Sequence, residues 1–84
     1  MSEVTHAAEL LGTRIREMRK KRRLTQVMLA ETGGIPQSHM SSIERGAMLP
    51  NLVTLFRLAA ALDCKVSKLV SVFDKEDLGS LFSK

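Results

Sequence analysis

The sequence predicts an all-α fold, a compact domain of five helices with a short C-terminal extension. Its 84 residues suit a single domain with a small core. Apolar residues recur at helical spacing, and no alternating apolar run is long enough for a strand. Glycine, proline and N-cap residues divide the chain at intervals that suit short helices, so each helix can be assigned in turn.

The first helix is predicted from Thr5 or Ala8 to Arg22. Its apolar positions recur at i, i+4 and i+7 and therefore share one face of the helix: Leu11, Ile15 and Met18. Seven of the ten residues in Arg14–Arg23 (RIREMRKKRR) are basic, and residues 1–23 hold the whole net charge of +4. Such a charge favours a polyanionic partner, although a solvated basic face also explains the run when it is considered alone.

Two short helices joined by a tight glycine turn are predicted next. Thr25 is a good N-cap for the second helix, and Gly33-Gly34 ends it because glycine tolerates a left-handed backbone. Pro36 opens the third helix, where its missing N–H costs nothing, and Gly46 ends that helix. The residues expected to be buried in this pair are Leu29, Ala30, Met40 and Ile43.

The last two helices follow Pro50-Asn51, with Asn51 as the N-cap of the fourth and Ser67 as the N-cap of the fifth. Their inward-facing residues are predicted to be Leu52, Leu55, Leu58, Ala59 and Leu62, followed by Leu69, Val70 and Phe73. In the tail, residues 74–84, the spacing of Leu78, Leu81 and Phe82 forms an amphipathic turn with no obvious surface to cover.

Several motifs resemble the lambda-repressor and Cro type of helix-turn-helix family. They are LTQ at Leu24–Gln26, LAE at Leu29–Glu31, the turn glycine Gly34, and MSSIERG at Met40–Gly46 followed by Pro50-Asn51-Leu52. The resemblance covers about residues 11–70 of the single domain 1–84, with the helix-turn-helix at about residues 25–45. It implies a five-helix, lambda-repressor-like domain that usually binds operator DNA as a homodimer.

In this family the third helix lies in the major groove with its N-terminal side chains at base edges. The resemblance therefore makes Gln37, Ser38 and Ser42 the expected base contacts. Gln37 can bind adenine through N6 and N7, a pairing that discriminates by about 1–3 kcal/mol. Without the resemblance, the simpler interpretation is that these short polar residues form an ordinary solvent-exposed face of the helix.

Other residues are expected to contact the DNA backbone or to hold the third helix in place. The expected backbone contacts are Thr25, Gln26, His39, Ser41 and Arg45. The resemblance also implies a structural salt bridge between Arg19 and Glu44. Breaking a buried pair would strand one charge at a cost of about 3–5 kcal/mol. An unpaired Glu44 would also place a negative charge near the phosphates, which is a further reason to expect it to be neutralised internally.

Some residues depart from the family pattern. Arg23 stands where a glycine commonly ends the first helix, which predicts either a strained turn or a different end to that helix, and Pro36 removes a side-chain cap. Val27 and Met28 are apolar where relatives tend to be polar, and we expect a terminus or a partner to cover them. We also expect a dimer interface at Met48, Leu49 and Val53, against the simpler interpretation of scattered surface hydrophobes.

Composition excludes several other classes of protein. No apolar stretch approaches the roughly 20 residues of a membrane span, and the N-terminus lacks the pattern of a signal peptide. The single cysteine, Cys64, fits a reducing cytoplasm, and we expect a bacterial or phage-encoded protein. The resemblance places Cys64 where the family has a core aliphatic residue, which implies a small buried position. Together with His6 and His39 it is too scattered for a recognisable zinc site, so no metal, cofactor or catalytic residue is expected.

The sequence thus predicts a regulator that binds specific double-stranded DNA, acting as a homodimeric repressor of a pseudo-palindromic operator. Two narrower identities stay open, an antitoxin that binds a toxin or another protein partner, and a controller of a restriction–modification system. A protein-interaction module that has lost DNA binding is the alternative from another class. The exposed apolar positions favour that alternative, whereas the basic first helix, Gln26, Gln37 and Arg45 oppose it.

Overall fold

The computed structural model describes residues 3–73, and these form five α-helices in the predicted order. Their bounds are α1 Glu3–Lys21, α2 Gln26–Gly33, α3 Gln37–Glu44, α4 Leu52–Ala61 and α5 Val66–Val70. The all-α prediction is confirmed, whereas the tail with Leu78, Leu81 and Phe82 lies outside the described residues. None of the helices found between residues 3 and 73 is long and apolar enough to cross a membrane.

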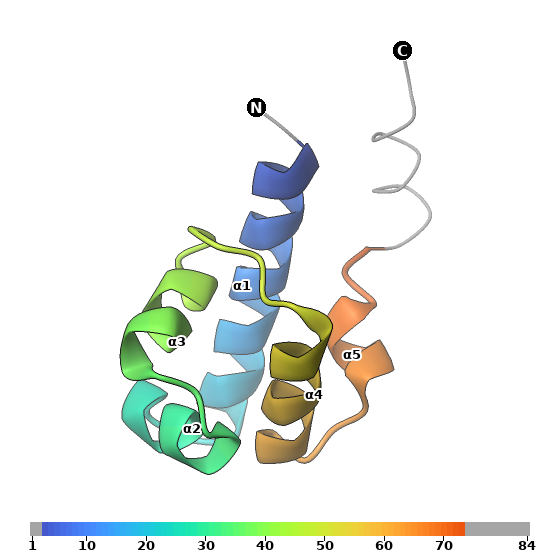
Figure 1. Ribbon diagram of the computed structural model, residues 1–84. Coiled ribbons are helices and arrows are strands. Elements are labelled where there is room, and N and C mark those ends of the chain that lie inside the picture. The colour runs from blue at the N-terminus through green and yellow to red at the C-terminus, as the bar shows by residue number, and fades with distance from the viewer. Residues whose placement is uncertain (1–2, 74–84) are drawn as a thin grey trace.

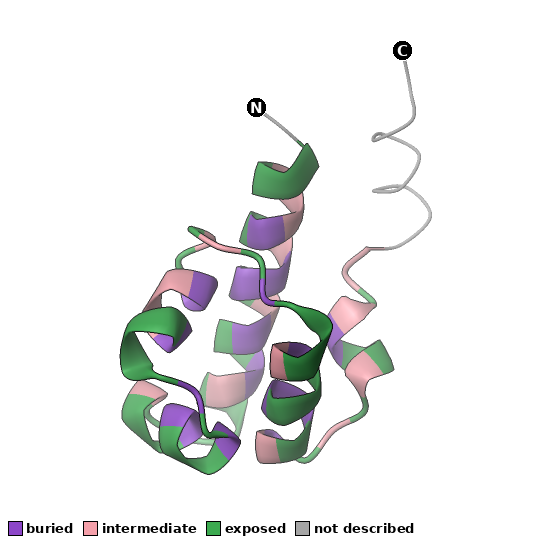
Figure 2. Cartoon of the chain, in the orientation of Figure 1, coloured by how far each residue is buried: buried purple, intermediate pink, exposed green. Residues whose placement is uncertain are grey.

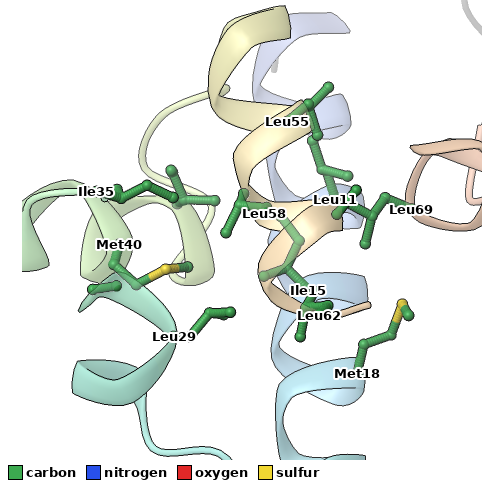
Figure 3. Close-up of a cluster of buried hydrophobic side chains, with 13 residues drawn as sticks. Leu11, Ile15, Met18, Leu29, Ile35, Met40, Leu55, Leu58, Leu62 and Leu69 are labelled. Carbon is green, nitrogen blue, oxygen red and sulfur yellow. The ribbon is translucent and has the colours of Figure 1, made fainter. Parts of the chain in front are cut away.

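Helix α1 runs through the middle of the domain, with α2 and α3 on one side and α4 and α5 on the other (Figure 1). It starts at Glu3, earlier than predicted, and ends at Lys21. The predicted stripe of Leu11, Ile15 and Met18 is buried and forms part of one continuous core. Figure 3 shows this core where side chains from α1, α2, α3, α4 and α5 meet.

The predicted caps of α2 and α4 are confirmed. The Thr25 hydroxyl accepts a hydrogen bond from the Met28 backbone N–H at 3.1 Å, and Asn51 Oδ1 accepts one from Thr54 N–H at 2.8 Å. The predicted cap of α5 is wrong, because the helix starts at Val66 and its N-cap residue is Lys65, which makes no side-chain cap. Ser67 therefore lies inside that helix.

Helices α1 to α4 end in the same hydrogen-bonding motif, in which one residue adopts a left-handed backbone. In α2 and α3 this residue is a glycine, Gly34 with φ 65° and Gly46 with φ 74°. In α1 and α4 it is Arg23 with φ 58° and Asp63 with φ 53°. Of the two alternatives predicted at Arg23, the strained turn is thus confirmed, since a side chain disfavours this conformation.

One expectation about the core is wrong. Leu52 was expected to face inward with Leu55 and Leu58, yet it is 62% exposed while the other two are buried. Leu52 is the first residue of α4, one turn before the part of the helix that α2 and α5 cover. An apolar side chain at the start of a helix was therefore assigned to the wrong face.

Candidate nucleic-acid interface

A tight turn fixes where α3 begins relative to α2. Gly34 adopts the left-handed conformation, its N–H donates to Glu31 O, and the Ile35 N–H donates to Ala30 O. Pro36 then precedes α3 with an extended backbone and supplies no side-chain cap, as its identity predicts. The fully buried Leu29 of α2 and Met40 of α3 belong to the same core cluster (Figure 3). The two short helices are therefore one packed unit.

A buried ion pair joins α3 to α1. Arg19 Nε donates to Glu44 Oε2 at 2.7 Å and Arg19 Nη2 donates to Glu44 Oε1 at 3.0 Å, in the pairing that the resemblance implies. The hydrogen bond to Glu44 raises the pKa of Arg19 above its usual value, so the guanidinium stays charged. A third bond, from Arg19 Nη1 to Leu24 O at 2.9 Å, ties the pair to the residue that precedes Thr25.

Gln26, the first residue of α2, extends this network. Its side-chain Nε2 donates to Glu44 Oε1 at 3.3 Å, so one carboxylate receives bonds from both α1 and α2. Gln26 is half-buried and lies next to the Thr25 cap, at the positive end of the α2 dipole. The N-terminus of α2 can therefore bind a phosphate oxygen, while the side-chain amide of Gln26 holds α3 in place through Glu44.

Close approach of α1 and α3 depends on a glycine that the sequence interpretation missed. A Cβ atom built on Gly12 would lie 2.3 Å from the Ile43 carbonyl oxygen and 3.0 Å from that of Glu44. Gly12 lies directly after Leu11 on the buried face of α1, and this position was the available signal. Only a residue without a side chain lets the two backbones meet here.

The outer face of α3 carries polar residues. Gln37, Ser38 and His39 are exposed, whereas Ser41 and Ser42 are half-buried. Exposed positions cover the outer turns of this helix in Figure 2. The predicted contact residues of α3 therefore lie on the accessible side of a helix whose other side is fixed in the core.

Arg45, the residue that directly follows α3, folds back over this outer face. Its Nη1 donates to Ser41 Oγ at 2.8 Å and its Nη2 lies 3.4 Å from Ser42 Oγ. Both serines are thus engaged by one guanidinium rather than free to act separately. The sequence predicted each of these three residues as an independent contact and gave no sign that they form a cluster.

The basic residues of α1 and of the turn that follows it divide into those that bond other parts of the chain and those that do not. Arg14 bonds Lys68 O and Ser71 Oγ on α5 and just beyond it, and Arg22 donates to Asp63 O at 3.2 Å. The remaining cations are exposed and have no ion pair within residues 3–73: Arg16, Lys20, Lys21 and Arg23. This arrangement leaves a positive surface around the end of α1 that leads to α2, which suits a polyanion.

The apolar residues predicted for a dimer interface are only partly accessible. Leu49 and Val53 are 40% and 58% exposed, but Met48 is half-buried and packs against the core. Two residues that the interface prediction omitted, Leu52 and Phe56, are 62% and 56% exposed. We name the set of Leu49, Leu52, Val53 and Phe56 the α4 stripe. Leu49 lies just before α4, and the other three residues lie on that helix at i, i+1 and i+4, a spacing that was visible in the sequence.

The remaining singled-out residues have ordinary environments. Val27 and Met28 are 43% and 47% exposed on α2, so no other part of the described chain covers them. Cys64 is half-buried against the core, and burial raises the pKa of its thiol, which keeps it protonated. Residues 3–73 contain no group of three or more side chains that could hold a metal ion.

Comparison with known proteins gives concordant results. Residues 15–69 match the helix-turn-helix family. An immunity repressor protein of Bacillus phage phi105 is 45% identical over 60 residues, which cover 71% of this chain and 42% of that protein. An HTH-type transcriptional regulator of Sinorhizobium fredii is 33% identical over 72 residues, which cover 86% of this chain and 94% of that protein. This chain therefore spans less than half of the phage protein but nearly all of the second relative.

Among solved structures, a restriction–modification controller protein from Aeromonas hydrophila, C.AhdI, superimposes with a TM-score of 0.72 at 35% identity. The match covers 74% of this chain and 94% of that one. A family regulator from Vibrio cholerae superimposes with a TM-score of 0.79 at 25% identity, over 92% of this chain and 43% of that one. The arrangement of the five helices is therefore shared with proteins of this kind.

Proposed function

The chain belongs to the helix-turn-helix family of DNA-binding transcriptional regulators, and from this premise we propose that it is a homodimeric repressor of a pseudo-palindromic operator. The observation that carries the proposal is the anchored α3. The Arg19–Glu44 pair and Gln26 hold one face of this helix, while its polar face is left accessible. A rigid helix with an open polar face is what reading of base edges requires.

On this proposal α3 enters the major groove with its N-terminal end toward the bases. Gln37 and Ser38 are the foremost exposed side chains and would contact base edges, with Ser42 one turn further along. Thr25, Gln26 and His39 would contact phosphates and fix the register without reading sequence. The roles of Ser41 and Arg45 depend on their mutual contact and are taken up in the next subsection.

The α4 stripe supports dimerisation. Four large apolar side chains, Leu49 just before α4 and three on one face of that helix, remain 40–62% exposed, and Figure 2 shows exposed positions along the outer surface of α4. A second copy that covers this stripe would remove apolar area from water and place two α3 helices on one side of the DNA. Half-sites about one helical turn apart would follow. Such a dimer would act in the cytoplasm, where its DNA lies.

Fluorescence anisotropy tests the proposal directly. The full chain is titrated against a labelled fragment from upstream of its own gene and against a random duplex, each at two salt concentrations. A specific regulator is expected to prefer its own upstream fragment by about a thousandfold or more. Equal binding to both duplexes would oppose sequence-specific regulation at that site, and absence of binding at low salt would overturn the DNA-binding proposal.

A restriction–modification controller is the second candidate function. The observation that favours it is the similarity to C.AhdI, which extends over 94% of that controller's chain. On either candidate function this chain would bind DNA, and the two differ in which genes the bound DNA controls. Transcription from the chain's own upstream fragment and from the promoters of restriction and modification genes beside it, measured with increasing protein, separates them, because only a controller would change the second.

A further inference from the structure

Arg45 is the longest polar side chain on the outer face of α3, and its guanidinium is held in place. Nη1 donates to Ser41 Oγ at 2.8 Å, and Nη2 lies 3.4 Å from Ser42 Oγ, so the side chain folds back by one helical turn. Arg45 is nevertheless exposed, and it forms no ion pair within residues 3–73. The cation is therefore positioned but not neutralised.

The position of Arg45 on α3 faces away from the core. The buried residues of this helix are Met40, Ile43 and Glu44, which share its inner side. Ser38, Ser42 and Arg45 follow each other at i, i+4 and i+7 and so form a ridge on the opposite side. Arg45 thus lies on the same outward line as two of the residues expected to contact bases, and not on the flank of the helix.

Serine side chains are short and reach only a little way from the helix towards the base edges, whereas an arginine on the same ridge reaches further. Of the five N–H donors of a guanidinium, the two serines engage two, which leaves three free in a planar fork. A planar fork of N–H donors matches the N7 and O6 acceptors of guanine in the major groove. The serine hydroxyls would fix the plane of the fork before DNA arrives.

We propose that Arg45 is a specificity-determining residue that reads a guanine in each half-site, with Ser41 and Ser42 as positioning residues. This inference rests on the proposed function, because it places α3 in the major groove. The sequence led us to expect separate phosphate contacts by Ser41 and Arg45. The proposal instead makes them one cluster that distinguishes one base pair from another. A phosphate contact is the same on every sequence, whereas a guanine contact depends on the base pair and is strongest with the planar fork of an arginine.

Selection from a randomised duplex library tests the proposal, with the full chain and its variants Arg45→Lys, Arg45→Ala and Ser41→Ala/Ser42→Ala. The wild type should select a G·C pair at one position of each half-site. Arg45→Ala should lose that preference and bind the selected site about 10- to 100-fold more weakly, with preferences at other positions kept. Arg45→Lys should keep only a weakened preference, because its ammonium can reach guanine O6 and N7 but lacks the planar fork. The double serine variant should weaken the same preference, because the charge remains but its orientation does not.

The Arg45→Ala variant decides between the two roles. If it keeps the preference at that G·C position, or if both Arg45 variants weaken binding equally on all sequences, Arg45 contacts phosphate and the inference is overturned. A wild type that selects no sequence at all would instead remove the proposed function, a different result from the same experiment. Lys65→Ala, which removes an equal charge at the start of α5, is the matched control, and circular dichroism checks that each variant is folded.

Discussion

Arg19 and Glu44 form a two-bond ion pair between the first and third helices, with only 12% and 3% of their side chains accessible to solvent. Glu44 is the one buried charged residue among those the structure describes. Because Gln26 also donates to its carboxylate, the three helices around the candidate DNA surface meet at this single group. The orientation of α3 is therefore set by electrostatics as well as by the apolar contacts of Met40 and Ile43.

Replacing Arg19 by methionine should destabilise the domain strongly. The variant Arg19→Met leaves the buried carboxylate of Glu44 with the weaker Gln26 bond alone, and the free energy of unfolding should fall by about 3–5 kcal/mol. The double variant Arg19→Met/Glu44→Leu should recover much of this loss, because no charge is then stranded. Urea denaturation followed by circular dichroism measures all three proteins.

Arg22→Ala is the matched control for that series. Its guanidinium lies 3.9 Å from the Asp63 carboxylate with 43% and 95% of the two side chains exposed, so the loss should stay below about 1 kcal/mol. An Arg19→Met protein as stable as Arg22→Ala would show that the buried pair is not what holds α3.

A substitution at the end of α1, at Arg23, should stabilise the domain. Arg23 has a positive φ of 58°, so Arg23→Gly should raise the free energy of unfolding by about 1 kcal/mol. Gly34→Ala makes the reverse change at φ 65° with nothing within 4 Å of the added Cβ, and should cost a similar amount. Thermal unfolding of both variants checks the pair, and a less stable Arg23→Gly protein would mean that the arginine side chain outweighs the strain of its backbone.

The comparison of sequence with structure explains which expectations succeed. Helix order and the caps at Thr25 and Asn51 follow from local chemistry, since a hydroxyl or amide at an N-cap needs only the next three residues. The Arg19–Glu44 pair joins residues far apart in sequence, and only the resemblance pointed to it. Contacts of this kind depend on how the helices pack, which periodicity does not contain.

The failures have the same cause. Leu52 has the periodicity of a core residue, but at the start of α4 no other helix covers it. Ser67 is a good capping residue that lies one residue inside a helix starting at Val66. The Arg45–Ser41 bond was not predicted, because the Arg45 side chain can either fold back over the preceding turn or extend into solvent. A sequence pattern does not say which of these two conformations is the more stable.

The α4 stripe predicts a dimer that charge should disrupt. Leu52→Asp/Phe56→Glu places two negative charges on residues that are 62% and 56% exposed, so the monomer should fold normally while self-association is lost. Sedimentation velocity at micromolar concentration should show a dimer for the wild type and a monomer for the variant. Val4→Asp, at an equally exposed position on α1, should remain dimeric, and a monomeric wild type would remove the stripe from the proposal.

Gln37 and Gln26 should have different effects on DNA binding although both are glutamines at the start of a helix. The Gln37 side chain is exposed and has no hydrogen bond among residues 3–73, so Gln37→Ala should relax specificity at one base pair of each half-site, at a cost of about 1–3 kcal/mol there. Gln26 bonds Glu44, so Gln26→Ala should weaken binding to all sequences and lower the stability of the domain.

Anisotropy on the preferred duplex, on a set with single base changes and on random DNA separates these two patterns. For Gln37→Ala the loss should appear on the preferred duplex and disappear on the duplex changed at the contacted base pair, because the contact is already absent there. For Gln26→Ala the loss should be the same on every duplex. An equal loss for Gln37→Ala on preferred and random DNA would place its amide on the phosphate backbone, and the base-reading role would then pass to Ser38 and the residues that follow it on the outer face of α3.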